Sequence, residues 1–193
     1  MSVQILRAAD LVATPWKNGG GVTREIIAWP PASDLSNFAC RVSMARVSDG
    51  GPFSTFPGVD RILTVLEGKM TLELPDRDVT LDGASEPFAF PGDIAVSARR
   101  PASPVTDFNV MTRRGEFSAR VERVRFQGER TLADLDWALI FCRSPGISLR
   151  SGDQTWTMGL NDSIVLVGET GIVATTSGGS DSDVLIARFE GSE

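Results

Sequence analysis

Residues 61–96 read RILTVLEGKMTLELPDRDVTLDGASEPFAFPGDIAV. This stretch begins with an apolar, β-branched run and continues as short runs separated by the turn signals Glu67-Gly68, Asp82-Gly83 and Pro91-Gly92-Asp93. Residues 137–167, WALIFCRSPGISLRSGDQTWTMGLNDSIVLV, repeat the order of strand, turn, strand, turn, Asp-containing corner and strand. Short strands at regular spacing with Gly and Pro turns are typical of β-sandwiches and barrels. The sequence therefore predicts an all-β protein of two jelly-roll-like halves.

The segment between the two repeats contains the best helix candidate, residues 130–137, which has a weak apolar period. We place the boundary between the halves in this region. A single unit of residues 1–193 then divides into a first half, residues 1–120, and a second half, residues 121–193.

The charge balance argues against some partners. The chain has 19 Lys and Arg against 25 Asp and Glu, a net charge of −6, so nucleic-acid binding is not expected. No apolar stretch reaches the length of a membrane span, and the N-terminus lacks the pattern of a signal peptide. We expect a cytoplasmic protein that contacts neither nucleic acid nor membrane.

Histidine is absent from the sequence. Its absence excludes Ser-His-Asp and Cys-His catalysis within the chain, as well as any metal site with His ligands. Carboxylates, Lys or a Cys thiolate remain for acid–base chemistry. Cys40 and Cys142 lie far apart in the sequence and are expected to be buried free thiols rather than a disulfide.

Four segments carry a specific family signature. They are PWKNGGGVTREI at 15–26, RVSMA at 41–45, DGGPFSTFPGVDR at 49–61 and DFNVMTRRG at 107–115. Together they resemble the HutD/Ves family, and the resemblance covers roughly residues 1–190.

The resemblance implies a bicupin, with two cupin β-barrels on one chain, and a homodimer. It also implies a place in histidine utilisation, where the family is thought to bind an intermediate such as urocanate or N-formylglutamate and to moderate flux or expression. No enzymatic activity is firmly assigned to the family, so we expect a binding protein and assign no catalytic residue.

The metal-binding pattern of cupins is lost in this sequence. When the His-x-His and Glu positions of that pattern are aligned on the turn after Leu66, they fall on Thr55, Pro57 and Arg61. We therefore expect no metal and no cofactor. An Arg in place of the acidic ligand suits an anion, because guanidinium can hold a carboxylate bidentately. Alternatively, Arg61 is a surface residue paired with a neighbouring carboxylate.

The Gly-rich run offers a second anion-binding element. Gly19, Gly20 and Gly21 could let successive backbone N–H groups converge, with Lys17 adding charge, Asn18 an amide and Trp16 an apolar wall. The alternative is a tight turn between two strands, with Trp16 in the core.

Arg24 lies on a predicted strand, on the face opposite Thr23 and Glu25. Its neighbours on that face are apolar, and a buried charge must be paired. We assign it to the ligand site, where it meets a carboxylate of either the ligand or the protein.

Asp107 and Asn109 share a face of another predicted strand and could contact polar ligand atoms, although a solvent-facing strand remains the alternative. Asp107 could equally pair with Arg24 or Arg61. Further support for the site is expected from Thr23, Arg41 and Ser43.

These residues favour a non-enzymatic protein that binds a small anionic metabolite. One alternative is a metal-independent isomerase or hydrolase acting on a small carboxylate, with Asp107 or Glu25 as base and Arg61 polarising the substrate. Another is a protein-interaction module, which a large exposed apolar patch would favour.

Overall fold

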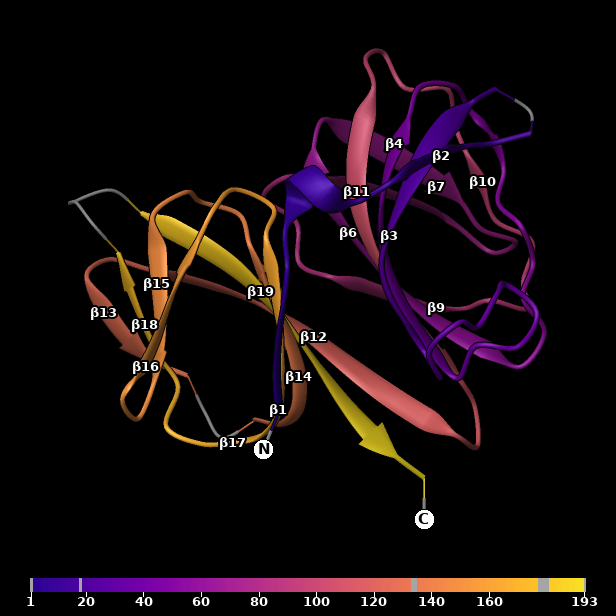
Figure 1. Cartoon of the computed structure of the whole chain (residues 1–193). Coiled ribbons are helices and arrows are strands. Elements are labelled where there is room, and N and C mark those ends of the chain that lie inside the picture. The colour runs from indigo at the N-terminus through magenta and orange to yellow at the C-terminus, as the bar shows by residue number, and fades with distance from the viewer. Residues whose placement is uncertain (1, 18, 133–134, 177–180, 193) are drawn as a thin grey trace. The chain divides into compact units, whose positions relative to one another are not determined.

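A computed structural model describes residues 2–17, 19–132, 135–176 and 181–192 (Figure 1). Almost all regular structure in these ranges is β-strand, apart from a single 3-10 turn at Ala8–Asp10. The chain forms two compact units. We call them the 12–119 unit, which includes 191–193, and the 120–190 unit, which includes 1–11.

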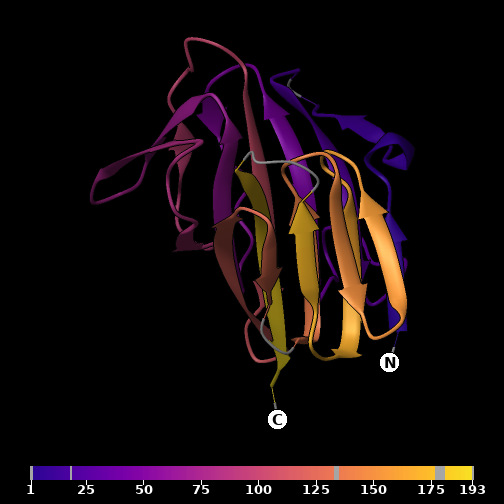
Figure 2. The same cartoon turned by 90° about the vertical axis from the view of Figure 1, so that its left-hand side faces the viewer.

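The 120–190 unit contains two antiparallel sheets, whose orange and yellow strands run side by side in Figure 2. Its core is a cluster of buried, mostly aliphatic side chains, among them the fully buried Ile140, Leu149 and Ile164. The first sheet is, in order, β1 (Ser2–Leu6), β17 (Ser163–Glu169), β14 (Leu135–Cys142), β19 (Ser182–Gly191) and β12 (Phe117–Phe126). The second is β13 (Glu129–Thr131), β18 (Val173–Thr176), β15 (Ile147–Ser151) and β16 (Gln154–Met158).

The 12–119 unit also pairs a large sheet with a small one. Its core contains Leu63, Val65, Met70, Leu72 and Phe90 from both sheets. The large sheet is β2 (Ala13–Pro15), β3 (Gly21–Trp29), β4 (Cys40–Val47), β11 (Val105–Arg113), β6 (Val59–Glu67) and β9 (Phe88–Pro91). The small sheet is β5 (Gly51–Pro52), β10 (Ser97–Ala98), β7 (Lys69–Glu73) and β8 (Asp78–Asp82).

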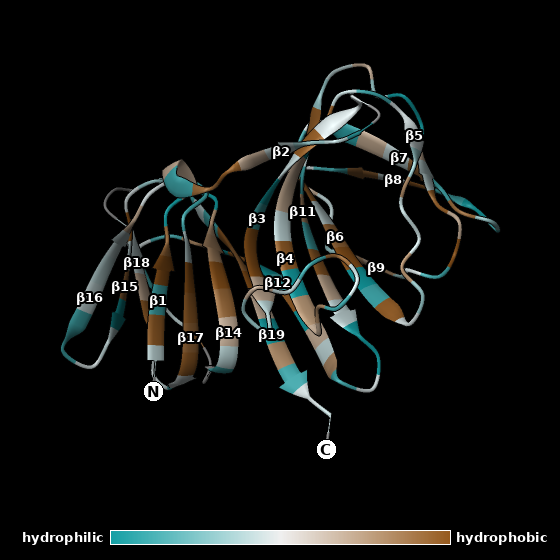
Figure 3. Cartoon of the chain, turned by 45° about the vertical axis from the view of Figure 1, so that its right-hand side comes forward, coloured by the Kyte–Doolittle hydropathy of each residue, from teal (hydrophilic) through white to brown (hydrophobic). Residues whose placement is uncertain are grey.

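The all-β class predicted from the sequence is confirmed. The sheets of each unit are separate and do not close on themselves, so the two-barrel detail stays a prediction. Figure 3 shows hydrophilic bands crossing the otherwise hydrophobic strands of the large sheet of the 12–119 unit.

Two expectations about the chain's organisation differ from the structure. β1 pairs with β17, so residues 1–11 fold with the 120–190 unit and not with the first half. The apolar side chains of Val3 and Ile5 pack on the core of that unit and account for the pairing. The helix expected over 130–137 was wrong in its described residues, because Glu129–Thr131 pairs with β18, and β14 begins at Leu135. Residues 133–134 lie outside the described ranges.

Both cysteines are buried free thiols, as expected. Burial raises the pKa of the Cys40 and Cys142 thiols to about 12, so neither thiol is a ready nucleophile at neutral pH. Within the part of the chain that the structure describes, no helix is long and apolar enough to cross a membrane.

Packing between the two sheets of the 12–119 unit predicts a sharp difference between two leucines. Leu72 on β7 is fully buried against the large sheet, so Leu72→Ala should lower the free energy of unfolding by about 2–5 kcal/mol. Leu35 is 55% exposed, and Leu35→Ala should change the free energy of unfolding by less than about 0.5 kcal/mol. Urea denaturation of the two variants measures these changes. Equal losses of unfolding free energy would contradict the packing of Leu72 in the core.

Candidate functional site

The register of β11 determines which polar side chains meet. In an antiparallel sheet, directly opposed residues point to the same face. Asn109 lies opposite Ser43 on β4 and Leu63 on β6, and two residues further on Met111 lies opposite Arg41 and Arg61. Asp107 lies two residues before Asn109 on the same face, opposite Ala45 and Val65.

This face points into the unit, because Leu63, Val65 and Phe90 share it and belong to the apolar core. We call it the inner face. On β4, β6 and β11 it carries five polar residues of the sequence prediction, which are Arg41, Ser43, Arg61, Asp107 and Asn109. Four of them are at least nine-tenths buried, and the side chain of the fifth, Arg41, is 11% exposed.

Arg61 is the central residue of the inner face. Its guanidinium carbon lies 5.1 Å from the ring centroids of both Phe53 and Phe90 and 5.8 Å from that of Phe56. Its Nη2 donates a hydrogen bond to Asn109 Oδ1 at 3.3 Å, whereas Nε is buried without a hydrogen-bond partner. Burial lowers the pKa of Arg61 to about 10, so the group stays cationic at neutral pH. The alternative of a surface Arg61 is therefore wrong.

Asp107 is the carboxyl group that interacts most with Arg61. It is 3% exposed, and burial raises the pKa of this carboxyl to about 7 although the charge of Arg61 acts to lower it. The group is therefore only partly ionised near neutral pH. The inner face consequently holds a permanent buried cation and an anion that is easily protonated.

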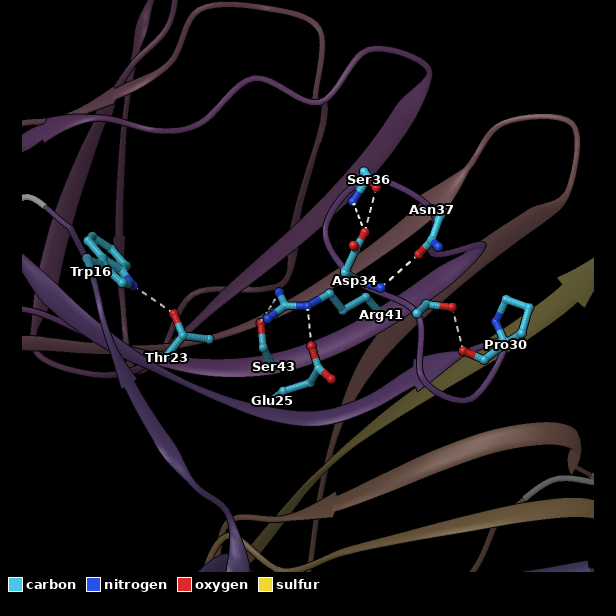
Figure 4. Close-up of polar contacts among 10 residues, drawn as sticks. Trp16, Thr23, Glu25, Pro30, Asp34, Ser36, Asn37, Arg41 and Ser43 are labelled. Atoms are coloured by element: carbon cyan, nitrogen blue, oxygen red, sulfur yellow. Dashed lines mark hydrogen bonds and ion pairs between the residues drawn. The ribbon is translucent and has the colours of Figure 1, made fainter.

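A second polar group surrounds Arg41 (Figure 4). Arg41 Nε donates to Glu25 Oε2 at 2.7 Å, and Nη1 donates to Ser43 Oγ at 3.2 Å. Further along β3, Thr23 Oγ1 accepts a hydrogen bond of 2.8 Å from Trp16 Nε1. Thr23 and Glu25 lie opposite Ala45 and Ser43, which places them on the inner face as well.

Arg24 does not join this group. It lies opposite Met44, between Thr23 and Glu25, and the pleat of β3 therefore directs it to the other face of the sheet. On that face it meets neither Arg61 nor Asp107. Because Arg24 is only partly buried, it needs no buried counter-charge. This placement does not support its assignment to the ligand site.

The Gly-rich run forms a tight turn between β2 and β3. Trp16 N donates to Gly21 O at 2.9 Å, and Gly19 N donates to Trp16 O at 3.0 Å. Trp16 packs on the core, and Lys17 is exposed. The structure thus matches the turn alternative, and Lys17 is not part of the inner face. Asn18 lies outside the described residues.

The sequence analysis missed the three phenylalanines around Arg61. Phe53 and Phe56 precede it in the 49–61 segment, and Phe90 lies directly opposite it on β9. Two aromatic residues shortly before an Arg at the start of an apolar strand were the available signal. Among the described residues, no group of three or more Cys, Asp and Glu side chains is placed to hold a metal ion.

Comparison with solved structures identifies the fold class of the chain. A cupin 2 conserved barrel domain protein from Leptotrichia buccalis matches 98% of this chain and 98% of its own, with a TM-score of 0.63 and 9% identity. That match shows a cupin-like fold and nothing about function.

The family model HutD matches residues 8–184, and the chain belongs to the HutD family. An uncharacterised 21.2 kDa protein in the hutC 3′ region of Pseudomonas putida is 34% identical over 86% of this chain and 87% of its own. HutD from Pseudomonas fluorescens SBW25, solved in a formate condition, matches the whole of both chains with 28% identity and a TM-score of 0.82. The structure of a conserved protein of unknown function from Pseudomonas aeruginosa PAO1 matches 98% of this chain and 100% of its own, with 28% identity and a TM-score of 0.89.

The pKa of Asp107 predicts a specific pH dependence of stability. Its pKa is about 7 in the folded protein, against an ordinary value of 3.8 for an exposed aspartate. Between these values the folded state binds more protons, so its stability falls as pH rises. Asp107→Asn should remove this fall and should be more stable relative to the parent at pH 8 than at pH 4. Urea denaturation across pH 4–8 measures the difference; parallel profiles would show that Asp107 titrates normally.

Proposed function

We propose that this protein binds a small carboxylate of histidine utilisation without transforming it, with Arg61 as the anchor for the carboxylate. The observation that carries this proposal is the buried Arg61 guanidinium whose Nε has no hydrogen-bond partner. A buried ionic group is costly unless it is paired and hydrogen-bonded. A carboxylate ligand would supply both the missing acceptor and the missing charge.

The surroundings of Arg61 favour an external anion over Asp107 as its partner. Asp107 is partly protonated near pH 7, so it does not fully balance the guanidinium. The guanidinium carbon lies over the rings of Phe53 and Phe90, which attract the cation but offer its unpartnered Nε–H no oxygen acceptor. Asn109 and Asp107 would then contact the polar end of the ligand, which for urocanate is the ring N–H.

Membership of the HutD family supports histidine utilisation as the context, with urocanate and N-formylglutamate as candidate ligands. We further propose that the two units are two cupin halves and that the protein works as a cytoplasmic homodimer that moderates flux or expression in this pathway. The cupin-like fold supports the first of these suggestions. The sheets are open and end in strands such as β8 and β16, and edge strands favour pairing between chains, which supports the dimer.

A metal-independent enzyme is the second candidate. The observation that favours it is Asp107, a buried carboxyl with a pKa of about 7, which is the range suited to a general base. It lies on the same face as Arg61, which could polarise a substrate carbonyl. Recovery of each ligand after incubation separates binding from turnover.

Arg61→Met should abolish carboxylate binding, because the substitution removes the positive charge. The methionine thioether can still pack against the rings of Phe53 and Phe90, so the fold should be kept. The measurement is thermal unfolding with formate, urocanate, N-formylglutamate and glutamate, followed by chromatography of each ligand. In the parent protein, a ligand at a hundred times its Kd should stabilise the fold by about 2.7 kcal/mol.

Arg99→Met is the matched control. Arg99 is half-exposed and pairs with Glu73 and Asp78 on the surface, so its variant should bind like the parent. Undiminished binding by Arg61→Met would remove Arg61 from the site. Consumption of a ligand would favour the metal-independent enzyme. If none of the acids shifts the unfolding temperature, the protein-interaction module becomes the favoured alternative.

A further inference from the structure

We propose that the inner face recognises a dicarboxylate, with one carboxylate held by Arg61 and the other by Arg41, where it takes the place of Glu25. This inference rests on the proposed function above and narrows its ligand class from small anions to acids with two carboxylates.

The two arginines are placed as a pair by the sheet. Arg41 on β4 and Arg61 on β6 both lie directly opposite Met111 on the strand between them. With neighbouring strands about 4.8 Å apart, their backbones are separated by about 10 Å on one face. The charge of Arg41 is felt at Arg61, where it contributes to the lowered pKa. Two cations this close favour a ligand with two anionic groups over a ligand with one.

Arg41 and its partner differ greatly in exposure. The Arg41 side chain is 11% exposed, whereas that of Glu25, which accepts its Nε–H, is 46% exposed. An ion pair with one partner in solvent contributes little to stability, so Glu25 can move into water at small cost. Arg41 stays where it is, because its Nη1 also donates to the buried Ser43 hydroxyl.

Glu25 therefore occupies the position of the second ligand carboxylate when no ligand is bound. On binding, the ligand carboxylate accepts the Nε–H of Arg41 and Glu25 turns outward. The exchange keeps Arg41 paired in both states, and the carboxylate at Arg61 fills the unpartnered Nε position. Acyclic acids such as N-formylglutamate fit this class, whereas urocanate, with one carboxylate, uses only Arg61.

Glutarate and its monomethyl ester test this inference, because they match in length and differ by one carboxylate. Isothermal titration calorimetry of the parent protein should show glutarate binding at least about tenfold tighter than the ester, as a paired arginine adds a charge-assisted bond. Arg41→Met should lose this preference, so that glutarate and the ester bind the variant with similar affinity. Glu25→Gln should bind glutarate more tightly than the parent does, because the competing carboxylate is gone.

A purely structural Arg41–Glu25 pair gives other results. Equal affinity of the parent for glutarate and its ester, or weaker glutarate binding by Glu25→Gln, would overturn the dicarboxylate. The proposed function would stand in that case, provided that the ester still binds and Arg61→Met abolishes its binding. If neither acid binds the parent, both proposals fail. Should Arg41→Met not fold, the ester comparison and Glu25→Gln still decide the question.

Discussion

The position of β11 between β4 and β6 is the constraint on which the interior of the 12–119 unit depends. Because opposed residues share a face, a single register places Arg61, Asn109 and Asp107 together on the inner side. A shift of β11 by one residue would turn Asp107 and Asn109 to the other face, away from Arg61 on β6, and bring apolar side chains of β11 inward. The core contacts of Leu63 and Val65 on the same face hold the register in place.

The burial of Arg61 and Asp107 has opposite consequences for the two groups. The guanidinium remains charged, because even a lowered pKa of about 10 lies well above neutrality, whereas the carboxyl becomes partly neutral near pH 7. The site therefore keeps an excess of positive charge inside a chain with a net charge of −6. Such an arrangement costs stability in the free protein, and a bound carboxylate would offset that cost.

Much of this site could be predicted from the sequence, because strand alternation alone placed Asp107 with Asn109 and separated Arg24 from Thr23. The cross-strand partners could not be predicted, since register depends on pairing between distant segments. The position of Phe90 opposite Arg61 and the pairing of β1 with β17 were missed for the same reason. The role of Arg24 was overestimated, because its degree of burial is a tertiary property that the pattern of one strand does not contain.

The most direct test of the central claim is an NMR titration that observes the Nε–H groups of arginine side chains, with the Arg61 signal assigned by its loss in Arg61→Lys. Because Nε is buried without a hydrogen-bond partner, it should be the group that a carboxylate reaches. Formate is the smallest probe of this contact. The account predicts a saturable downfield shift of the Arg61 Nε–H signal as formate is added. A signal that stays in place while formate binds elsewhere in the protein would contradict it.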